Sequence, residues 1–288
     1  MKFSIFDKRV VIKCCSSIFT FGGAIIGVIS ALFSNWVSKN SFFILMVWGF
    51  LWFLYYFFIL FKEHRMDRLV LKINDSEVEI INGDILRNCE DDSLRVIAFN
   101  EYFDTLVDEK IISSGSINGK FLNTLTDNEL NELDDFIKNN NELSDRFILQ
   151  NVNRKRGKKK KYKIGSILCY KKNYLLTAFS KFDEKDRANL TLAEYIEFLM
   201  EFWNEIDRVY AGRTVELPLL GGGITRFKDT GNSLSHQELI ENILWTFKIS
   251  RLKFSYPAKI RILLYKDEKV NEIKKIDLIK LKEMFKNE

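Results

Sequence analysis

The segment LPLLGGGITRF, residues 217–227, places three consecutive glycines and an arginine directly after an apolar run. Glycines reach positive φ and leave their N–H groups uncovered, and uncovered N–H groups after a strand suit an anion such as a phosphate. A tight turn explains the same glycines without any ligand. The segment therefore indicates either a phosphate cradle or a turn, and other parts of the chain must distinguish the two.

Several other chemistries do not fit the residues. The P-loop needs a lysine and a hydroxyl after its last glycine, and the residues after the glycines here do not supply them. The Rossmann fingerprint needs a further glycine at a helix start, and this segment lacks it. The two histidines, His64 and His236, are not spaced like the base of a nucleophilic triad, and the four cysteines lack metal-ligand spacing. We therefore predict no metal site and no catalytic residue. His236 could contact a ligand near the glycine segment, although a surface position at the start of a helix is the simpler explanation.

Strand-like and helical patterns alternate along the part of the chain that must position these residues. Strands are expected at 68–73, 77–82, 94–99, 174–179, 214–220 and 259–265, the last three apolar enough to be covered on both faces. Capping boxes predict helices that begin at Thr126, Thr191 and Ser235, and 270–285 predicts a final helix. Apolar residues predict one buried face of the second helix: Leu192, Tyr195, Ile196, Leu199, Met200, Trp203 and Ile206. This interleaving predicts a three-layer α/β/α domain with a largely parallel or mixed central sheet, whose ligands lie beyond the carboxyl ends of strands.

Two N-terminal stretches are typical of membrane spans. Residues 14–33 and 42–61 contain no charged residue, and 20 helical residues match a hydrocarbon core of about 30 Å. A cleaved signal peptide does not explain the second stretch. We predict a transmembrane hairpin in 1–66, with spans of about 11–33 and 41–62, followed by a cytosolic domain in 67–288. Basic residues flank the outer ends of the pair, which predicts a multi-pass protein of the inner (plasma) membrane with both termini cytoplasmic.

Two further features bear on partners. The first span carries Gly23-x-x-x-Gly27, a small-residue stripe that lets helices pack closely, and neither span contains an ionisable residue that would mark an ion path. The basic run NRKRGKKKKYK, 153–163, could bind anionic lipid or nucleic acid. We favour a solvated surface loop between two strands and do not expect nucleic acid binding, because only Tyr162 offers an aromatic ring among these charges.

Several segments together resemble a known family. NGDIL at 82–86 follows a strand, VIAFN at 96–100 ends a buried strand in Asn100, and the glycine segment comes late in the chain. In this order they resemble the macrodomain, a fold that binds ADP-ribose. With SSGSINGKFL at 113–122, NYLLTAFSKFD at 173–183 and the hairpin, the chain is similar to the membrane-anchored macrodomain effectors of type II Thoeris anti-phage defence.

The resemblance implies roles for individual residues. It makes Asp84 the acceptor of the adenine amino group beside the Ile85 backbone, and brings Asn100 to the distal ribose. A carboxylate suits an amino group, which offers only donors. The diphosphate would be wrapped by main-chain amides of Gly221, Gly222, Gly223, Ile224 and Thr225. Arg226 departs from ordinary macrodomains, which have a small residue there, and a guanidinium could clamp the phosphates. The remaining implied ligand contacts are Ser114, Ser116, Gly119, Leu220 and Phe227.

The resemblance also implies a function. The ligand would be an ADP-ribose derivative, with histidine–ADP-ribose as a candidate, made from NAD by a partner with a TIR domain. Binding would cause homo-oligomerisation, and the clustered hairpins would disrupt the lipid bilayer. Two alternatives stay open. The first is a membrane-tethered hydrolase of ADP-ribose linkages, although 113–122 has only Gly115 and Gly119 where hydrolytic members have a long glycine-rich loop. The second is a passive anchor in which the glycines are a turn.

Overall fold

A computed structural model describes residues 8–64, 68–87, 92–223, 225–229, 234–255, 257–265 and 277–285 of the chain. Contacts within the chain divide it into two compact units, Met1–Asp67 and Arg68–Glu288. The first unit is helical and the second contains the sheet, and each is described here by itself.

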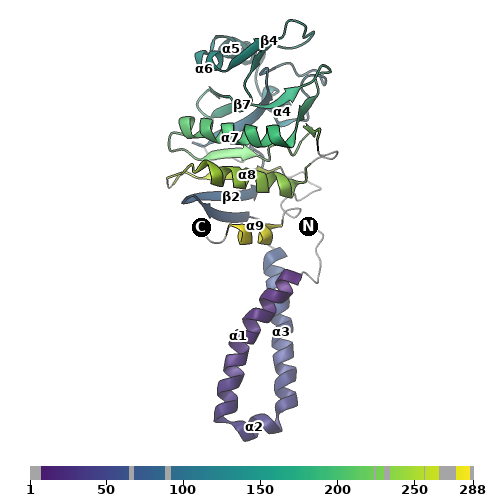
Figure 1. Ribbon diagram of the computed structural model, residues 1–288, viewed down its shortest axis with the longest axis vertical. Helices are drawn as coiled ribbons and strands as arrows, with labels where there is room; N and C mark the ends of the chain where they lie inside the picture. Colours follow the sequence, from purple (N-terminus) through teal and green to yellow (C-terminus); the bar gives the residue numbers. More distant parts are fainter. Residues whose placement is uncertain are drawn as a thin grey trace. The chain divides into compact units, whose positions relative to one another are not determined.

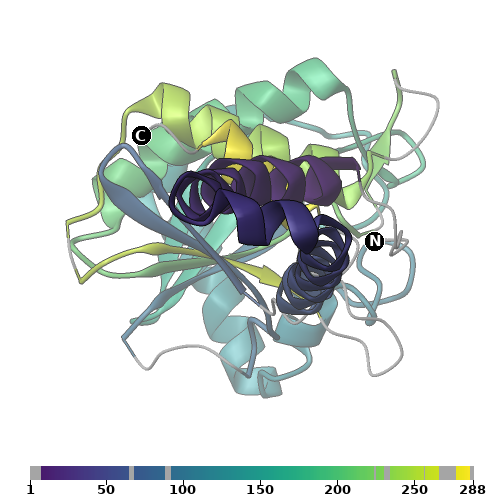
Figure 2. The same cartoon turned by 90° about the horizontal axis from the view of Figure 1, so that it is seen from below.

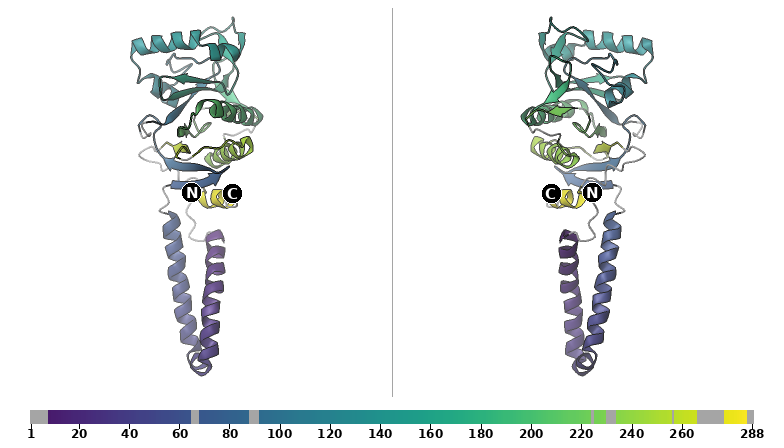
Figure 3. Two further views of the ribbon diagram at one scale, coloured as in Figure 1. Left: turned by 90° about the vertical axis from the view of Figure 1, so that its left-hand side faces the viewer. Right: turned by 90° about the vertical axis from the view of Figure 1, so that its right-hand side faces the viewer.

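The first unit consists of α1 (Lys8–Leu32), α2 (Ser34–Lys39) and α3 (Ser41–His64). Within them, Cys14–Leu32 and Ser41–Ile59 are long and apolar enough to cross a membrane. The helices α1 and α3 run side by side, and α2 joins the C-terminal end of α1 to the N-terminal end of α3 (Figure 3). We expected the residues between the two apolar stretches to form a loop. They form instead one short helix, which ends where the Asn40 side chain donates to the carbonyl of Trp36 at 2.9 Å.

The helices α1 and α3 pack closely at Gly22, and not at Gly23 or Gly27 of the small-residue motif. A Cβ added to Gly22 would lie 2.6 Å from Nε1 of Trp48, so only glycine fits at this crossing. Gly23 and Gly27 are exposed, and no atom of the described residues lies within 4 Å of a Cβ added to either. The Gly23-x-x-x-Gly27 stripe therefore does not hold this hairpin together.

The second unit is built on a mixed sheet of nine strands (Figure 1). Eight strands follow one another in space as β1 (Arg68–Ile73), β2 (Ser76–Asn82), β11 (Ile260–Leu264), β9 (Val215–Pro218), β3 (Leu94–Asn100), β7 (Tyr174–Phe182), β8 (Ala188–Leu190) and β10 (Arg226–Phe227), and β6 (Ile167–Tyr170) pairs with β7. The five strands β2, β11, β9, β3 and β7 are mutually parallel, so their carboxyl ends meet at one edge. The mixed α/β sheet predicted from the sequence is confirmed.

Helices cover both faces of this sheet. The helices α7 (Leu192–Val209) and α8 (His236–Ser250) lie on one face, and α4 (Ile117–Leu122), α5 (Asp127–Asn139) and α6 (Asn141–Asp145) lie on the other (Figure 2). All three predicted capping boxes are present, because the hydroxyl of each N-cap accepts from the N3 amide and the N3 glutamate bonds back. The buried face of α7 is wider than predicted and includes Phe198 and Phe202, while Leu192, Ile196 and Met200 are only half-buried. Of the final predicted helix, α9 (Leu278–Met284) is observed, and 270–276 lies outside the described residues.

Buried charges cross the middle of the sheet in register. Arg261 on β11 is directly opposite Glu79 on β2 and Glu216 on β9. Its Nε lies 2.9 Å from Glu79 Oε2, and its Nη1 lies 2.6 Å from Glu216 Oε1. All three are buried, and Glu79 also pairs with Lys259 at 3.4 Å and with Arg68 at 3.5 Å, so removing Arg261 would weaken a network of buried charges. The apolar pattern of 259–265 gave no indication of these ion pairs.

Candidate functional site

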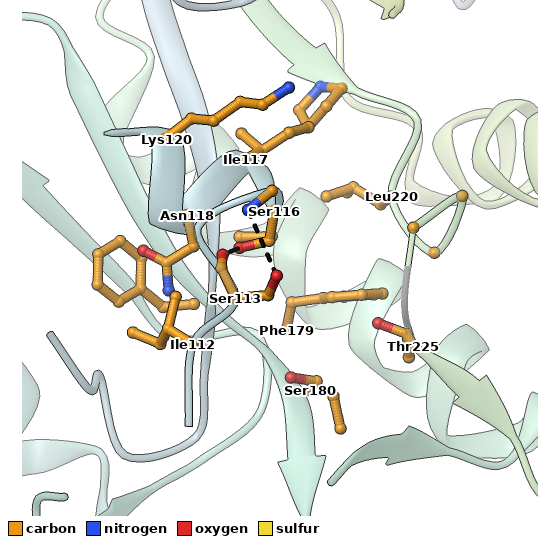
Figure 4. A pocket seen from close by; sticks show the side chains of 18 of the residues that line it. Ile112, Ser113, Ser116, Ile117, Asn118, Lys120, Phe179, Ser180, Leu220 and Thr225 are labelled. Atoms are coloured by element: carbon orange, nitrogen blue, oxygen red, sulfur yellow. Dashed lines mark hydrogen bonds between the residues drawn. The ribbon is translucent and has the colours of Figure 1, made fainter. Parts of the chain in front are cut away.

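A cavity of about 610 Å³ opens at the edge where the parallel strands end. Residues from five strand ends line it: Asp84 after β2, Asn100 at the end of β3, Ser180 in β7, Leu219 after β9 and Leu264 at the end of β11. Figure 4 shows Ser116 and Asn118 on one side, with Leu220 and Thr225 on the opposite side. Crevices at the carboxyl ends of parallel strands are where sheets of this kind bind ligands.

The three glycines of 221–223 lie on this cavity, and their local surroundings differ. Gly221 has φ +89°, and a Cβ there would lie 3.0 Å from Leu239 Cδ2. A Cβ on Gly222 would lie 3.1 Å from the carbonyl oxygen of Leu219, and the Gly222 N–H donates to that oxygen at 3.0 Å. Packing and turn geometry inside the protein therefore already explain two of the three glycines.

Gly223 is the glycine that intramolecular packing does not explain. A Cβ at this position would meet no atom of the described residues within 4 Å, and the backbone there is exposed on the cavity. The amide of Gly222 is used within the turn, which leaves those of Gly221, Gly223 and Thr225, among the described residues of the predicted cradle, as candidate donors to an anion.

The carbonyl group at the start of the turn is hydrogen-bonded to a buried tyrosine. The hydroxyl of Tyr195 on α7 donates to the carbonyl of Leu220 at 2.9 Å, and burial raises the pKa of Tyr195 far above its ordinary value. Phe227 packs edge-on against the Tyr195 ring, with centroids 5.4 Å apart, and is buried. Phe227 was expected to touch the ligand, but it supports the turn and does not line the cavity. Thr225 and exposed Arg226 do line it, and Ile224 lies outside the described residues.

Asp84 and Ile85 line the same cavity as the glycines, as the predicted site requires. One carboxylate oxygen of Asp84 accepts the Leu86 N–H at 2.9 Å, and the other lies 3.9 Å from Arg87 Nε. Ile85 is buried beneath them in the hydrophobic core. The Asp84 side chain is a quarter exposed, so a carboxylate stands at the cavity wall in a fixed orientation.

Asn100 lines the cavity and also closes the turn that follows β3. Its Oδ1 accepts the Tyr102 N–H at 2.9 Å, and its Nδ2 donates to Asp104 Oδ2 at 3.0 Å. Its Oδ1 also accepts the Asp104 N–H at 3.4 Å, so the second N–H of the amide group is what can make a further bond. The side chain is therefore a strand-end cap whose position at the cavity also permits ligand contact.

The 113–122 segment contributes different residues from those predicted. Ser116 lines the cavity as expected, together with Ser113 and Gly115. Ser114 is exposed outside the cavity, where its N–H donates to Glu109 Oε1 at 2.9 Å. Gly119 is also outside the cavity: a Cβ there would lie 2.1 Å from the Ser113 carbonyl oxygen, so this glycine permits α4 to pack on the preceding loop. The structure therefore does not bring Ser114 and Gly119 to the cavity wall with the other predicted contacts.

The basic run 153–163 begins in the loop after β4 (Phe147–Gln150) and continues through β5 (Lys160–Tyr162), so it is not simply a solvated loop between two strands. Arg154 is only 8% exposed, with Nη2 lying 2.7 Å from Asp104 Oδ2 and 3.0 Å from Asp186 Oδ1. Its guanidinium also lies 4.0 Å from the Tyr102 ring centroid. Because Asp104 bonds Asn100 and Asp186 lines the cavity, Arg154 braces one wall of the site.

Further cations of the run have partners as well. Lys158 Nζ lies 2.6 Å from Asp134 Oδ1, and burial lowers the pKa of this lysine despite that partner. Lys161 pairs with the fully buried Glu101 at 3.1 Å. The run therefore offers less charge to lipid or nucleic acid than its composition suggests.

Comparison with known proteins identifies the family. Residues 78–265 match the family described as "Thoeris protein ThsA, Macro domain". A curated relative, Thoeris protein ThsA of Bacillus amyloliquefaciens (strain Y2), is 43% identical over 224 residues, which is 77% of this chain and 72% of the relative. The chain belongs to the Thoeris ThsA macrodomain family.

Two solved macrodomains of Oceanobacillus iheyensis are similar at lower identity. A mutant form is 16% identical with a TM-score of 0.48 and covers 76% of this chain and 100% of its own. A structure described as the macrodomain with ADP is 15% identical with a TM-score of 0.46, covering 75% and 97%. The family assignment rests on the sequence matches alone.

Several residues of the macrodomain cavity were not predicted. Lys120 lines it with its Nζ 4.2 Å from the Tyr265 ring centroid. His236, for which ligand contact was left open, lines it from the start of α8. Asn118 lines it while 8% exposed, and its Oδ1 accepts no hydrogen bond from the residues that the structure describes. An unpaired buried carbonyl favours a ligand that brings a donor, such as a hydroxyl. Asn118 and Lys120 belong to SSGSINGKFL, 113–122, but nothing in that segment distinguishes the side chains that face the cavity from those that pack elsewhere.

Arg187 is held at the cavity wall by its own turn. Asp183 Oδ2 accepts from Arg187 Nε at 2.8 Å, and Asp183 Oδ1 accepts the N–H groups of Lys185 and Arg187. Burial opposes ionisation of Asp183, but these hydrogen bonds prevail and lower its pKa to about 2. The carboxylate is thus charged at neutral pH and keeps the guanidinium in place.

The site has the chemistry of a receptor for a nucleotide-like ligand. Arg187 and Arg226 supply positive charge on the glycine side, while Asp84 supplies a carboxylate that can accept from a base. Within the described parts of the chain there is no group of three or more histidine, cysteine or acidic residues that could hold a metal ion. The donors and acceptors at the wall suit polar recognition.

Proposed function

We propose that this chain is a membrane-anchored sensor that binds an ADP-ribose-type signalling nucleotide in the macrodomain cavity. On binding, copies self-associate, and their apolar hairpins disrupt the membrane as an anti-phage defence. The protein would sit in the inner (plasma) membrane with both termini in the cytoplasm, following the basic residues that flank the hairpin.

One observation carries the nucleotide part of this proposal. The carboxylate of Asp84 and the exposed backbone of Gly223 line a single cavity, and nothing in the described protein fills the space above Gly223. A diphosphate can approach a bare backbone closely, while the base reaches a carboxylate further along the same cavity. Gly223 differs in this from Gly221, whose Cβ position lies 3.0 Å from Leu239 Cδ2.

The signal is proposed to be an ADP-ribose derivative, for which histidine–ADP-ribose is a candidate, supplied by a TIR-domain partner. The name of the Bacillus relative places that protein in the Thoeris system, and we extend this context to the present chain. Sensing is proposed ahead of turnover, because 113–122 has only Gly115 and Gly119 where a hydrolytic loop would be glycine-rich.

Calorimetry of the full chain in lipid nanodiscs tests this proposal. ADP-ribose and histidine–ADP-ribose are each titrated into the wild type, Asp84→Ala and the matched control Asp135→Ala, which removes an exposed carboxylate outside the cavity. We expect saturable heat in the wild type and the control. The affinity should fall at least tenfold in Asp84→Ala, because a hydrogen bond to a charged group contributes about 1.5–3 kcal/mol.

The result would oppose the proposal if neither nucleotide gave heat with the wild type, or if Asp84→Ala bound as tightly as Asp135→Ala. The hydrolase alternative has its own assay, which is release of ADP-ribose from an ADP-ribosylated protein. Release by the wild type that is lost in Asn100→Ala would favour turnover over sensing.

A further inference from the structure

The hairpin of β4 and β5 has an apolar edge that nothing in the described chain covers. The strand β4 pairs with β5 alone, in a two-stranded sheet separate from the main one. All four of its residues are exposed, with Phe147 at 45%, Ile148 at 50% and Leu149 at 44%, and Val152 just beyond is 67% exposed. An unpaired strand edge with exposed apolar side chains is a template for pairing with another strand, and most proteins protect such edges.

We propose that β4 is the surface through which two copies of this chain associate, by antiparallel pairing of their β4 edges. This inference rests on the proposed function, for which it names the self-association surface. Pairing of a strand with its own copy around a two-fold axis satisfies the free backbone groups of both strands at once. It also brings the apolar side chains of the two edges together and removes them from water.

The charges at the two ends of β4 favour this occupant and this direction. Exposed Asp145 lies two positions before Phe147, and the intervening Arg146 is paired with Glu201 and Glu205. At the other end, the last residue of the strand, Gln150, is paired with exposed Lys160 on β5. Exposed Lys155 and Lys159 lie near that second end. Antiparallel pairing sets the acidic end of one copy against the basic end of the other, whereas parallel pairing would set lysines against lysines.

The hairpin is linked to the ligand cavity by buried contacts. Arg154, in the loop that joins β4 to β5, bonds Asp104 and Asp186, and Asp186 lines the cavity. At the other end of the hairpin, Tyr162 is buried and its N–H donates to the Glu101 carbonyl at 2.8 Å. A ligand that changes the cavity wall can therefore change the position of the β4 edge. Binding and association are then coupled, and each strengthens the other.

The small size of the β4 edge also bears on the kind of association. A four-residue edge is a small interface, and small interfaces give weak, reversible association. Such an edge suits assembly that depends on a ligand.

Assembly of the full chain in detergent micelles tests this inference. Sedimentation measures the wild type, Ile148→Glu and the control Ile249→Glu, each with and without histidine–ADP-ribose, and ADP-ribose serves as a second probe. Ile249 on α8 is also an exposed isoleucine, at 62% against 50% for Ile148, and does not belong to β4. We expect Ile148→Glu to need at least tenfold more protein for ligand-dependent assembly, with unchanged nucleotide affinity, and Ile249→Glu to behave as the wild type.

A charge reversal tests the direction of pairing without disturbing the apolar edge. Asp145→Lys and Lys160→Glu should each weaken assembly, and the doubly reversed protein should recover it. Absence of recovery overturns the antiparallel arrangement.

The possible outcomes separate this inference from the proposed function. If the wild type assembles with nucleotide and Ile148→Glu assembles equally well, β4 is not the surface, and ligand-driven association stands. If the wild type binds nucleotide without assembling, self-association itself fails, and the inference falls with it. Loss of binding to anionic vesicles in Ile148→Glu, with assembly intact, would make lipid the occupant and overturn the inference.

Discussion

The glycine turn at 221–223 and the basic run at 153–163 both look like anion-binding segments in the sequence, yet the fold uses them in opposite ways. The turn has no side chains and borders the cavity directly, with Arg226 exposed beside it. The run has many cations, and one of them, Arg154, is buried between Asp104 and Asp186. Composition suggests that the run is the better anion site, and the structure favours the turn.

This difference shows that the charge of a segment matters less than whether that charge is already paired. A buried ion pair neutralises its members and holds them in place, so Arg154 contributes rigidity to the cavity wall and little attraction for a ligand. An uncovered backbone amide carries only a partial positive charge, smaller than the full charge of a guanidinium, but it remains accessible to a phosphate. The following substitutions test the contrast.

Arg154→Ala should have the largest effect, and mainly on stability. Removing one member of a buried pair leaves Asp104 buried without its main partner, so the free energy of unfolding should fall by about 3–5 kcal/mol. Urea denaturation of the full chain measures this change. Lys160→Ala, an exposed cation of the same run, should change stability by less than about 0.5 kcal/mol. Equal effects of the two substitutions would mean that the run is uniformly solvated.

Substitutions at the glycines should separate packing from ligand contact. Gly221→Ala forces a Cβ onto a backbone with φ +89°, 3.0 Å from Leu239, and should destabilise the protein by about 1–3 kcal/mol. Gly223→Ala should leave stability nearly unchanged, because the space is open, while nucleotide affinity falls about tenfold. Thermal unfolding and calorimetry measure the two quantities. Unchanged affinity in Gly223→Ala would place the phosphates elsewhere.

Asp183→Asn should have the smallest effect, with a defined pH dependence. Its hydrogen bonds lower the pKa of Asp183 to about 2 from an ordinary 3.8, so the charged form stabilises the native turn above pH 3.8. That contribution is lost as the pH falls through about 2. We expect the variant to be about 1 kcal/mol less stable at pH 7, and the difference to shrink below pH 4. A difference that grew on acidification would contradict this assignment, and exposed Asp135→Asn serves as the control.

The elements predicted correctly are those with a local signal. A capping box involves residues three positions apart, and a buried strand is a short apolar run, so both can be recognised in sequence. The strand β4 was missed because FILQ is four residues long and lies beside polar loops. The short helix α2 was missed because six residues between two apolar stretches resemble a connection.

At the site, the strand-end positions of Asp84, Asn100 and the glycines followed from their place in the chain. The distinction between lining residues and supporting residues did not. Phe227 and Gly119 belong to the right segments but pack inward, against Tyr195 and Ser113 respectively. Which way a side chain points at the end of a strand depends on what packs beneath it, and that neighbour is distant in sequence.

The sequence by itself determined the apolar hairpin, the α/β sheet, the capped helices and membership of the family, because each depends on residues close together in the chain or on overall similarity. Only the tertiary structure decided which charges remain available and which glycine is open to a ligand. Arg154 meets Asp104 across 50 positions and Asp186 across 32. An ion pair of this kind forms only when the fold brings its two charges together and excludes water from them, so no local pattern can reveal it.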